Sequence, residues 1–164
     1  MKSSRRDAFE ALCREEYAAV VRTAWLITGD REEALDVAQE TFARAYERWR
    51  TVENLDRPAA WLQRVAGNLA LSWRRREKRY LRTQVSEPTV APPEVADTEL
   101  LDALRTLSPA QRTAIVLRFY ADLSVAETAV SLHKKEGTVR ALTSQGMERL
   151  RSALKKVEAD DERS

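Results

Sequence analysis

The apolar residues of this chain recur every three to four positions over most of its 164 residues, which is the spacing of an amphipathic helix. In the first half the pattern predicts three helices, over about 7–28, 31–49 and 58–82. Gly29 offers a stop for the first helix, and Asp30 with Glu33 makes a capping box for the second. Pro58 suits the first turn of the third. No segment alternates apolar and polar residues as a half-buried strand does, so the sequence predicts an all-α fold.

The second of these helices has two distinct faces. Its expected inner stripe is mostly apolar and consists of Leu35, Ala38, Phe42, Ala45, Tyr46 and Trp49. Its opposite face is mostly polar and consists of Asp36, Gln39, Glu40, Ala43, Arg44 and Glu47. A helix with this division buries the first face against its neighbours and leaves the second one exposed.

The second half of the chain predicts shorter helices, the first over about 98–106. At Ser108 an N-cap is followed by a proline at the first helical position and a glutamine at the third, which starts another helix. Its expected buried residues are Ile115, Val116, Phe119 and Tyr120.

The stretch from Leu123 to Arg151 has the pattern of a helix-turn-helix, which lays its second helix in the major groove of DNA. Ser124 and Glu127 form a capping box for its first helix. The second helix presents short and medium polar groups of the kind that read base edges, namely Thr138, Arg140, Ala141, Thr143, Ser144 and Gln145. A helical hairpin used only for packing has the same spacing, so the pattern alone leaves both interpretations open.

Periodicity is lost between residues 83 and 97, a stretch with three prolines and no basic residue. The sequence therefore predicts two small helical domains, over 1–82 and 98–164, joined by a flexible linker over 83–97. The tail from about residue 157 is expected to be disordered.

The net charge of +2 hides an uneven distribution. Residues 61–82 carry seven basic and one acidic side chain, residues 83–102 carry five acidic and no basic ones, and residues 103–164 are again basic. Two basic segments separated by an acidic one indicate two contacts with a polyanion. The basic run after Trp73 adds aromatic faces that could stack on unpaired bases, although a solvated helix end explains such a run equally well.

Other chemistry finds little support in the sequence. No apolar run has the length of a membrane span, and the N-terminus has no apolar core of a signal peptide. Cys13 and His133 are too few ligands for a metal site. No phosphate-binding glycine loop or catalytic motif is found, so we expect no catalysis, cofactor, metal or small-molecule substrate of its own. A single cysteine together with the lack of an export signal predicts a cytoplasmic protein.

Four stretches resemble the extracytoplasmic-function (ECF) group of sigma-70-like sigma factors. Residues 36–46, DVAQETFARAY, resemble the family helix D-L-V-Q-E-T-F-x-R-A-W. Residues 58–70, PAAWLQRVAGNLA, are similar to W-L-x-R-I-A-x-N-x-A. Residues 107–112, LSPAQR, resemble L-P-x-x-x-R, and residues 123–151 resemble L-S-x-x-E-I-A-x-x-L-G-x-S-x-G-T-V-K. Their order and separations match those of the family.

The resemblance implies a promoter-specificity subunit that binds the RNA polymerase core and promoter DNA, and that an anti-sigma factor could hold. It assigns contact with the β′ clamp helices to Asp36, Gln39, Glu40, Ala43, Arg44 and Glu47. It assigns melting and capture of the −10 element to Asn54, Trp61, Arg64, Asn68, Arg74, Arg75 and Arg76. The second domain would meet the β flap and read the −35 element through Lys134, Lys135, Thr138, Arg140, Ala141, Ser144 and Gln145.

The chain departs from the family pattern in and after the turn of the helix-turn-helix. His133 stands where the family has glycine, which predicts strain at a position that needs a positive φ. Lys135 stands where a serine caps the recognition helix, and Gln145 where many members have arginine. We therefore expect an unusual or weak dependence on the −35 element.

Two other functions remain open from the sequence alone. The chain could be an autonomous helix-turn-helix regulator that binds duplex DNA without polymerase. It could also be a helical adaptor whose apparent helix-turn-helix only packs.

Overall fold

The computed structural model describes residues 2–80 and 98–164, except for the side chains of Lys2 and residues 73–80. Within these ranges the chain is helical and has no strand, which confirms the predicted all-α fold. The elements are α1 (Lys2–Thr28), α2 (Arg31–Glu47), α3 (Trp49–Val52), α4 (Pro58–Tyr80), α5 (Thr98–Arg105), α6 (Pro109–Ile115), the π-helix η1 (Val116–Tyr120), α7 (Val125–Leu132) and α8 (Glu136–Glu162). The predicted linker, 83–97, lies outside the described residues.

The helix boundaries follow local signals in the sequence. Gly29 ends α1 with a φ of +72°, and the Asp30 carboxylate accepts a hydrogen bond of 3.1 Å from the Glu33 amide at the start of α2. Ser108 and Ser124 each form a complete capping box, at α6 and α7. The caps at Gly29, Ser108 and Ser124 were predicted, because the groups that form them are close together in the sequence. The capping box predicted at Asp30 forms only in part, since the Asp30 amide donates to the Thr28 hydroxyl at 3.3 Å.

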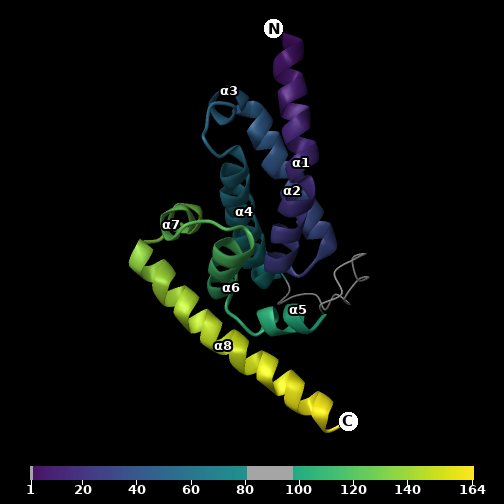
Figure 1. Ribbon diagram of the computed structural model, residues 1–164, viewed down its shortest axis with the longest axis vertical. Helices are drawn as coiled ribbons and strands as arrows, with labels where there is room; N and C mark the ends of the chain where they lie inside the picture. Colours follow the sequence, from purple (N-terminus) through teal and green to yellow (C-terminus); the bar gives the residue numbers. More distant parts are fainter. Residues whose placement is uncertain (1, 81–97) are drawn as a thin grey trace.

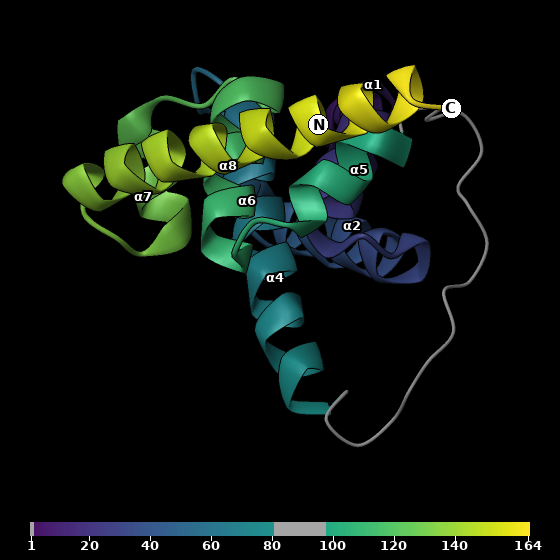
Figure 2. The same ribbon diagram turned by 90° about the horizontal axis from the view of Figure 1, so that it is seen from below.

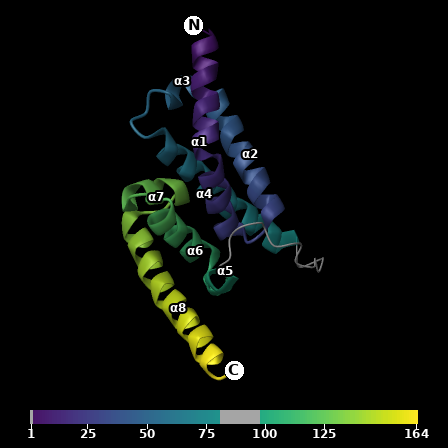
Figure 3. The same ribbon diagram turned by 45° about the vertical axis from the view of Figure 1, so that its right-hand side comes forward.

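In the first half α1, α2 and α4 pack side by side as a three-helix bundle (Figures 1 and 3). The buried stripe of α2 differs from the predicted one and consists of Ala34, Val37, Ala38, Thr41, Phe42 and Ala45. Leu35 and Tyr46 are instead 36% and 67% exposed. The small residues of the true stripe let α1 and α4 approach closely, whereas the larger Leu35 and Tyr46 are turned outward. The Tyr46 ring meets Phe9 edge-on, with 5.3 Å between the ring centroids.

The second half contains α5, α6, η1 and the two helices α7 and α8 of the helix-turn-helix. Phe119 and Tyr120 were predicted to be buried but are 60% and 39% exposed. The reason is the π-helix, in which the Ala121 amide bonds the carbonyl of Val116 at 3.0 Å. The wider turn shifts the register of the residues after Leu117 relative to an α-helix.

The helix α8 is long and continues to Glu162 (Figure 1). The tail that was expected to be disordered from about residue 157 is therefore helical up to that point. Val157, half-buried, lies in this last part of α8.

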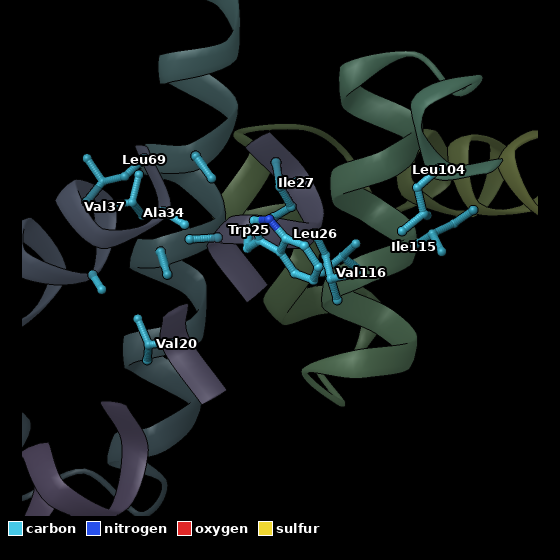
Figure 4. Close-up of a cluster of buried hydrophobic side chains, with 14 of the residues drawn as sticks. Val20, Trp25, Leu26, Ile27, Ala34, Val37, Leu69, Leu104, Ile115 and Val116 are labelled. Atoms are coloured by element: carbon cyan, nitrogen blue, oxygen red, sulfur yellow. The ribbon is translucent and has the colours of Figure 1, made fainter. Parts of the chain in front are cut away.

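The two halves do not lie apart but share one hydrophobic core. Trp25, Leu26 and Ile27 of α1 belong to the same buried cluster as Leu104 of α5 and Val116 of η1. Figure 4 shows the side chains of Trp25 and Leu26 beside Val116. Seen from below, the C-terminal part of α4 projects beyond this shared core (Figure 2).

Candidate functional site

The predicted polymerase-binding residues form one open face of α2. Asp36, Gln39, Glu40, Ala43, Arg44 and Glu47 are all exposed. The Arg44 guanidinium pairs with the Glu40 carboxylate one turn away, with 3.0 Å between Nε and Oε1. An open groove of about 450 Å³ runs between this face and α4 and is lined by Asp36, Gln39, Glu40, Arg44, Asn68, Leu69 and Ser72.

The predicted −35 residues form a second open face, on α8 and the turn before it. Lys134, Lys135, Thr138, Arg140, Ala141, Ser144 and Gln145 are all exposed. The opposite side of the helix is anchored by Val139, which is fully buried against Ala129 and Leu132 of α7. The packing of α7 on α8 thus leaves the polar face of α8 free.

The turn between α7 and α8 has the predicted departures from ideal geometry. His133 adopts the left-handed conformation, with φ of +52° and ψ of 45°, and is exposed. Lys135 is the N-cap of α8, and its side chain makes no capping hydrogen bond. The Lys134 and Lys135 side chains therefore stand next to the uncapped N-terminal amides of α8, where the helix dipole favours an anion.

The predicted −10 residues differ in their exposure and in their contacts. Asn54 is exposed and its amide nitrogen donates to the Arg50 carbonyl at 2.7 Å. Trp61 is half-buried and packs on the main core, which favours a packing role for it. Arg74, Arg75 and Arg76 lie in the helical part of α4 whose side chains are outside the described residues.

Arg64 and Asn68 lie one turn apart on α4, and both contact α7. The Asn68 amide nitrogen donates to the Ser131 carbonyl at 2.9 Å. The Ser131 hydroxyl in turn donates to the Arg64 carbonyl at 2.7 Å. Ser131 was not predicted as a site residue, because no local pattern shows that α7 meets α4.

A second contact between the halves lies beside the first. Arg57, just before α4, forms an ion pair with Glu127 of the α7 capping box, with 3.2 Å between Nη1 and Oε1. Burial raises the pKa of the Glu127 carboxyl, but hydrogen bonds with Ser124 and the charge of Arg57 outweigh it and hold this pKa below its ordinary value of 4.5.

Arg112 of α6 is a buried cation that the sequence did not single out, although it ends the LSPAQR stretch. It is only 3% exposed. Its guanidinium donates to the carbonyls of Leu104, Arg105 and Leu107 at 2.8–3.3 Å, and to that of Ile27 at 3.0 Å. It therefore sits at the C-terminal ends of two helices, α1 and α5, where their dipoles favour a positive charge.

The described residues lack two features that other classes of function would need. Among them, no helix combines the length and hydropathy needed to cross a membrane. The same residues contain no group of three or more His, Cys, Asp or Glu side chains placed to hold a metal ion.

Two family models match the chain, one in each half. The model of sigma-70 region 2 matches residues 12–80, and that of sigma-70, region 4, matches residues 97–150. The first match contains α2 and α4, and the second contains the helix-turn-helix. Matches in both halves favour a sigma factor over an autonomous regulator.

Similar proteins cover nearly the whole chain. The RNA polymerase sigma-E factor of Streptomyces coelicolor is 34% identical over 153 residues, which are 89% of this chain and 85% of that protein. The ECF RNA polymerase sigma factor SigL of Mycobacterium tuberculosis is 34% identical over 155 residues, 87% of each protein.

A solved structure has the same fold. The sigma factor RpoE of Bartonella quintana, in complex with the anti-sigma factor NepR, has a TM-score of 0.76 at 22% identity and covers 90% of this chain and 97% of that one. The fold, the matches to both sigma regions and the relatives at 34% identity lead to one conclusion: this chain belongs to the ECF family of RNA polymerase sigma factors.

Proposed function

We propose that this chain binds core RNA polymerase through α2, captures the −10 element through α4 and reads the −35 element through α8. The observation that carries this proposal is that every residue of the α2 and α8 faces is exposed, although each helix is packed along its other side. Surface helices generally have an exposed polar face, so the assignment of these two faces to polymerase and DNA also rests on the matches to sigma-70 regions 2 and 4.

The α2 face is suited to a protein partner, and we assign it to the β′ clamp helices. Its charges are mixed, with Asp36, Glu40 and Glu47 beside Arg44, and the groove next to it could receive side chains of a partner helix. The second half would meet the β flap.

The α8 face is suited to duplex DNA. Lys134 and Lys135 would contact phosphates at the uncapped start of the helix, where backbone amides add to their charge. Arg140, Ser144 and Gln145 follow on the exposed side and would reach base edges. The left-handed turn at His133 and the lack of a side-chain cap at Lys135 support an unusual or weak dependence of this chain on the −35 element.

The α4 residues Arg64 and Asn68 would hold bases of the unpaired −10 strand. An amide can pair with the hydrogen-bonding edge of an unstacked base, and an arginine can pair with phosphate or stack on a base. Asn54, in the loop before α4, would also contact the −10 strand. Arg74, Arg75 and Arg76 would bind phosphates of the promoter backbone.

The test is run-off transcription with core polymerase and fragments of genomic DNA. We expect transcripts from a subset of fragments only when the chain is present. Glu40→Lys, which reverses a charge on the α2 face, should lower the yield at least about tenfold, because like charges across an interface cost several kcal/mol. Glu15→Lys makes the same change at an exposed position of α1, outside the three proposed contacts, and should leave the yield unchanged.

An autonomous regulator gives a different result. It would shift duplex DNA in a gel as strongly without core polymerase as with it, and no fragment would yield a polymerase-dependent transcript. That outcome would reject the sigma-factor mechanism for this chain.

An anti-sigma factor is a further partner that we propose. The similar RpoE of Bartonella quintana was solved with NepR, and the similar sigma factor CnrH with the cytosolic domain of CnrY.

A role in transcription would place the protein in the cytoplasm. Its single cysteine, Cys13, is half-buried and free, which agrees with that compartment.

A further inference from the structure

The helix α8 continues far beyond its proposed −35 residues. It spans Glu136–Glu162, whereas the last residue proposed to reach a base edge is Gln145. At about 1.5 Å per residue, roughly 25 Å of helix follow Gln145. One side of α8 packs against α6 and α5, and Figure 1 shows the helix running past both of them. This packing explains why the extension is helical, but not which groups its other side carries.

The extension begins with a cationic segment, residues 149–156. It contains no acid, and its four cations are all exposed, namely Arg149, Arg151, Lys155 and Lys156. Within the part of the chain that the structure describes, none of these four forms an ion pair. Arg140, earlier on the same helix, instead pairs with the Glu136 carboxylate at 3.5 Å. The segment therefore presents positive charge that the protein itself does not compensate.

The order of charges along this extension does not stabilise the helix. A helix C-terminus favours cations, yet the last turn of α8 has no basic residue and contains Asp160, Asp161 and Glu162. Arg151 and Lys155 are one turn apart, a spacing at which like charges destabilise a helix. An anionic partner outside the helix explains the position of the cations better than helix stability does.

Arg149 belongs to the face of α8 that is proposed to read the −35 element. It follows Gln145 by one helical turn, so the two side chains are neighbours on the helix surface. Gln145, Arg149 and Lys156 line the same open groove of about 560 Å³, which lies between α8 and α6. The other polar residues of this groove are Thr106, Gln111, Ser152 and a single acid, Glu148.

We propose that Arg149 binds a phosphate of the duplex at the edge of the major groove that α8 enters. It lies eight residues beyond Ala141, about 12 Å along the helix, which equals the width of that groove. The guanidinium would therefore meet the strand that borders the groove. A phosphate contact adds affinity for DNA of any sequence, which suits a chain with a weak dependence on the −35 bases. This inference rests on the proposed −35 role of α8.

Neutralising Arg149 should change the salt dependence of promoter binding. Each phosphate contact adds about 0.9 to the magnitude of the slope of log K against log salt concentration. For polymerase holoenzyme assembled with Arg149→Gln, we expect a slope smaller by about 0.9 than that of the wild type. The advantage of the wild type over this variant should then shrink about three- to fourfold between about 50 and 200 mM salt.

The probe is a fluorescent fragment of a promoter that the wild-type chain transcribes in the run-off assay. A second fragment differs only in a scrambled −35 element. A phosphate contact predicts that Arg149→Gln loses the same factor in affinity on both fragments, whereas the loss of a base contact would appear only on the first.

Three further variants test the role of the charge. Arg149→Lys keeps the charge and should retain the slope of the wild type. Arg14→Gln removes the same charge from an exposed position of α1, outside the three proposed contacts, and should also leave the slope unchanged. Lys156→Gln should change the slope less than Arg149→Gln does, because Lys156 lies about 10 Å further along the helix, where salt screens most of the attraction.

Neutral phosphates locate the contact on the DNA. A set of fragments has a single methylphosphonate at each successive position of both strands, across the −35 element and the base pairs that flank it. At one position the wild type should lose about three- to fourfold in affinity at the lower salt concentration, while Arg149→Gln loses nothing, because the variant no longer makes that contact.

The outcomes separate this inference from the proposed function. If Arg149→Gln has the slope of Arg14→Gln, if Arg149→Lys loses as much as Arg149→Gln, or if every methylphosphonate affects wild type and Arg149→Gln alike, the phosphate contact is refuted while the sigma function stands. Reduced transcription with an unchanged slope would place Arg149 at a protein contact with polymerase and would also refute it. If the wild-type chain gives no polymerase-dependent transcript, the proposed function fails, and this inference fails with it.

Discussion

Replacing Arg112 by methionine should be among the most damaging single changes in this chain. The arginine is 3% exposed and donates to four backbone carbonyls, three around the end of α5 and one, that of Ile27, near the end of α1. Methionine fills a similar volume but has no donor, so Arg112→Met leaves these carbonyls without the guanidinium.

The size of the effect follows from two opposing terms. Hydrogen bonds from a charged donor contribute about 1.5–3 kcal/mol each, so four would sum to about 6–12 kcal/mol. Removing the cation also removes the cost of keeping it from water, which is several kcal/mol for a buried ion. We therefore expect a net loss of about 3–5 kcal/mol in the free energy of unfolding. For a chain of this size that loss lowers Tm by roughly 6–20 °C.

Urea denaturation followed by circular dichroism measures this loss. Arg105→Met is the control, since Arg105 also reaches the end of α1, with 3.5 Å from its Nη2 to the Gly29 carbonyl, but its side chain is 50% exposed. The control should cost less than about 1 kcal/mol. If Arg112→Met is no more destabilising than Arg105→Met, the buried hydrogen bonds do not hold the end of α1 to the second half as described.

Two further predictions concern the helix-turn-helix. His133→Gly should raise the free energy of unfolding by about 1 kcal/mol in thermal melts. A left-handed conformation costs a non-glycine residue about 1–3 kcal/mol, and the larger entropy that glycine loses on folding offsets part of this gain. Lys134→Gly is the control: Lys134 has no positive φ, so this change should destabilise the protein. The pKa of Glu127 is lowered in the folded chain, so its ionised carboxylate stabilises the protein. The wild type should therefore have a higher urea midpoint than Glu127→Gln, and this difference should be fully present above pH 4.5. It should vanish as the pH falls through the lowered pKa and the carboxylate is protonated. A difference that persists or grows on acidification would contradict the interaction with Ser124 and Arg57.

The features that could be predicted from the sequence depend on neighbouring residues. The caps at Ser108 and Ser124 and the stop at Gly29 each involve groups within a few positions, so their geometry is set locally. The exposed face of α8 was also predicted, because the apolar residues of that helix leave only one side for polar groups. Thr143 is the exception, since it is half-buried and its hydroxyl donates to the Val139 carbonyl at 2.8 Å. The left-handed turn at His133 was predicted from the resemblance to the sigma-factor pattern, which has glycine at this position.

The features that could not be predicted depend on distant contacts. The stripe of α2 was misassigned because large residues were preferred for the interior, whereas the approach of α1 and α4 selects alanine and threonine. The exposure of Phe119 and Tyr120 follows from a π-helix, for which the sequence has no clear signal. Gly67 lies in the sigma-like stretch over residues 58–70, but only the position of Leu117 shows why no side chain fits there.

The union of the two halves is itself a source of stability that the sequence does not reveal. Leu71 belongs to α4, yet it is 3% exposed because Ala114, Leu132 and Val139 of the other half surround it. Exposing one leucine costs about 1.5–3 kcal/mol. The periodicity of the 58–82 helix could mark Leu71 as an inner residue, but it could not show that the residues covering it come from beyond the predicted linker. The shared core therefore holds together two segments that the sequence predicted as separate small domains.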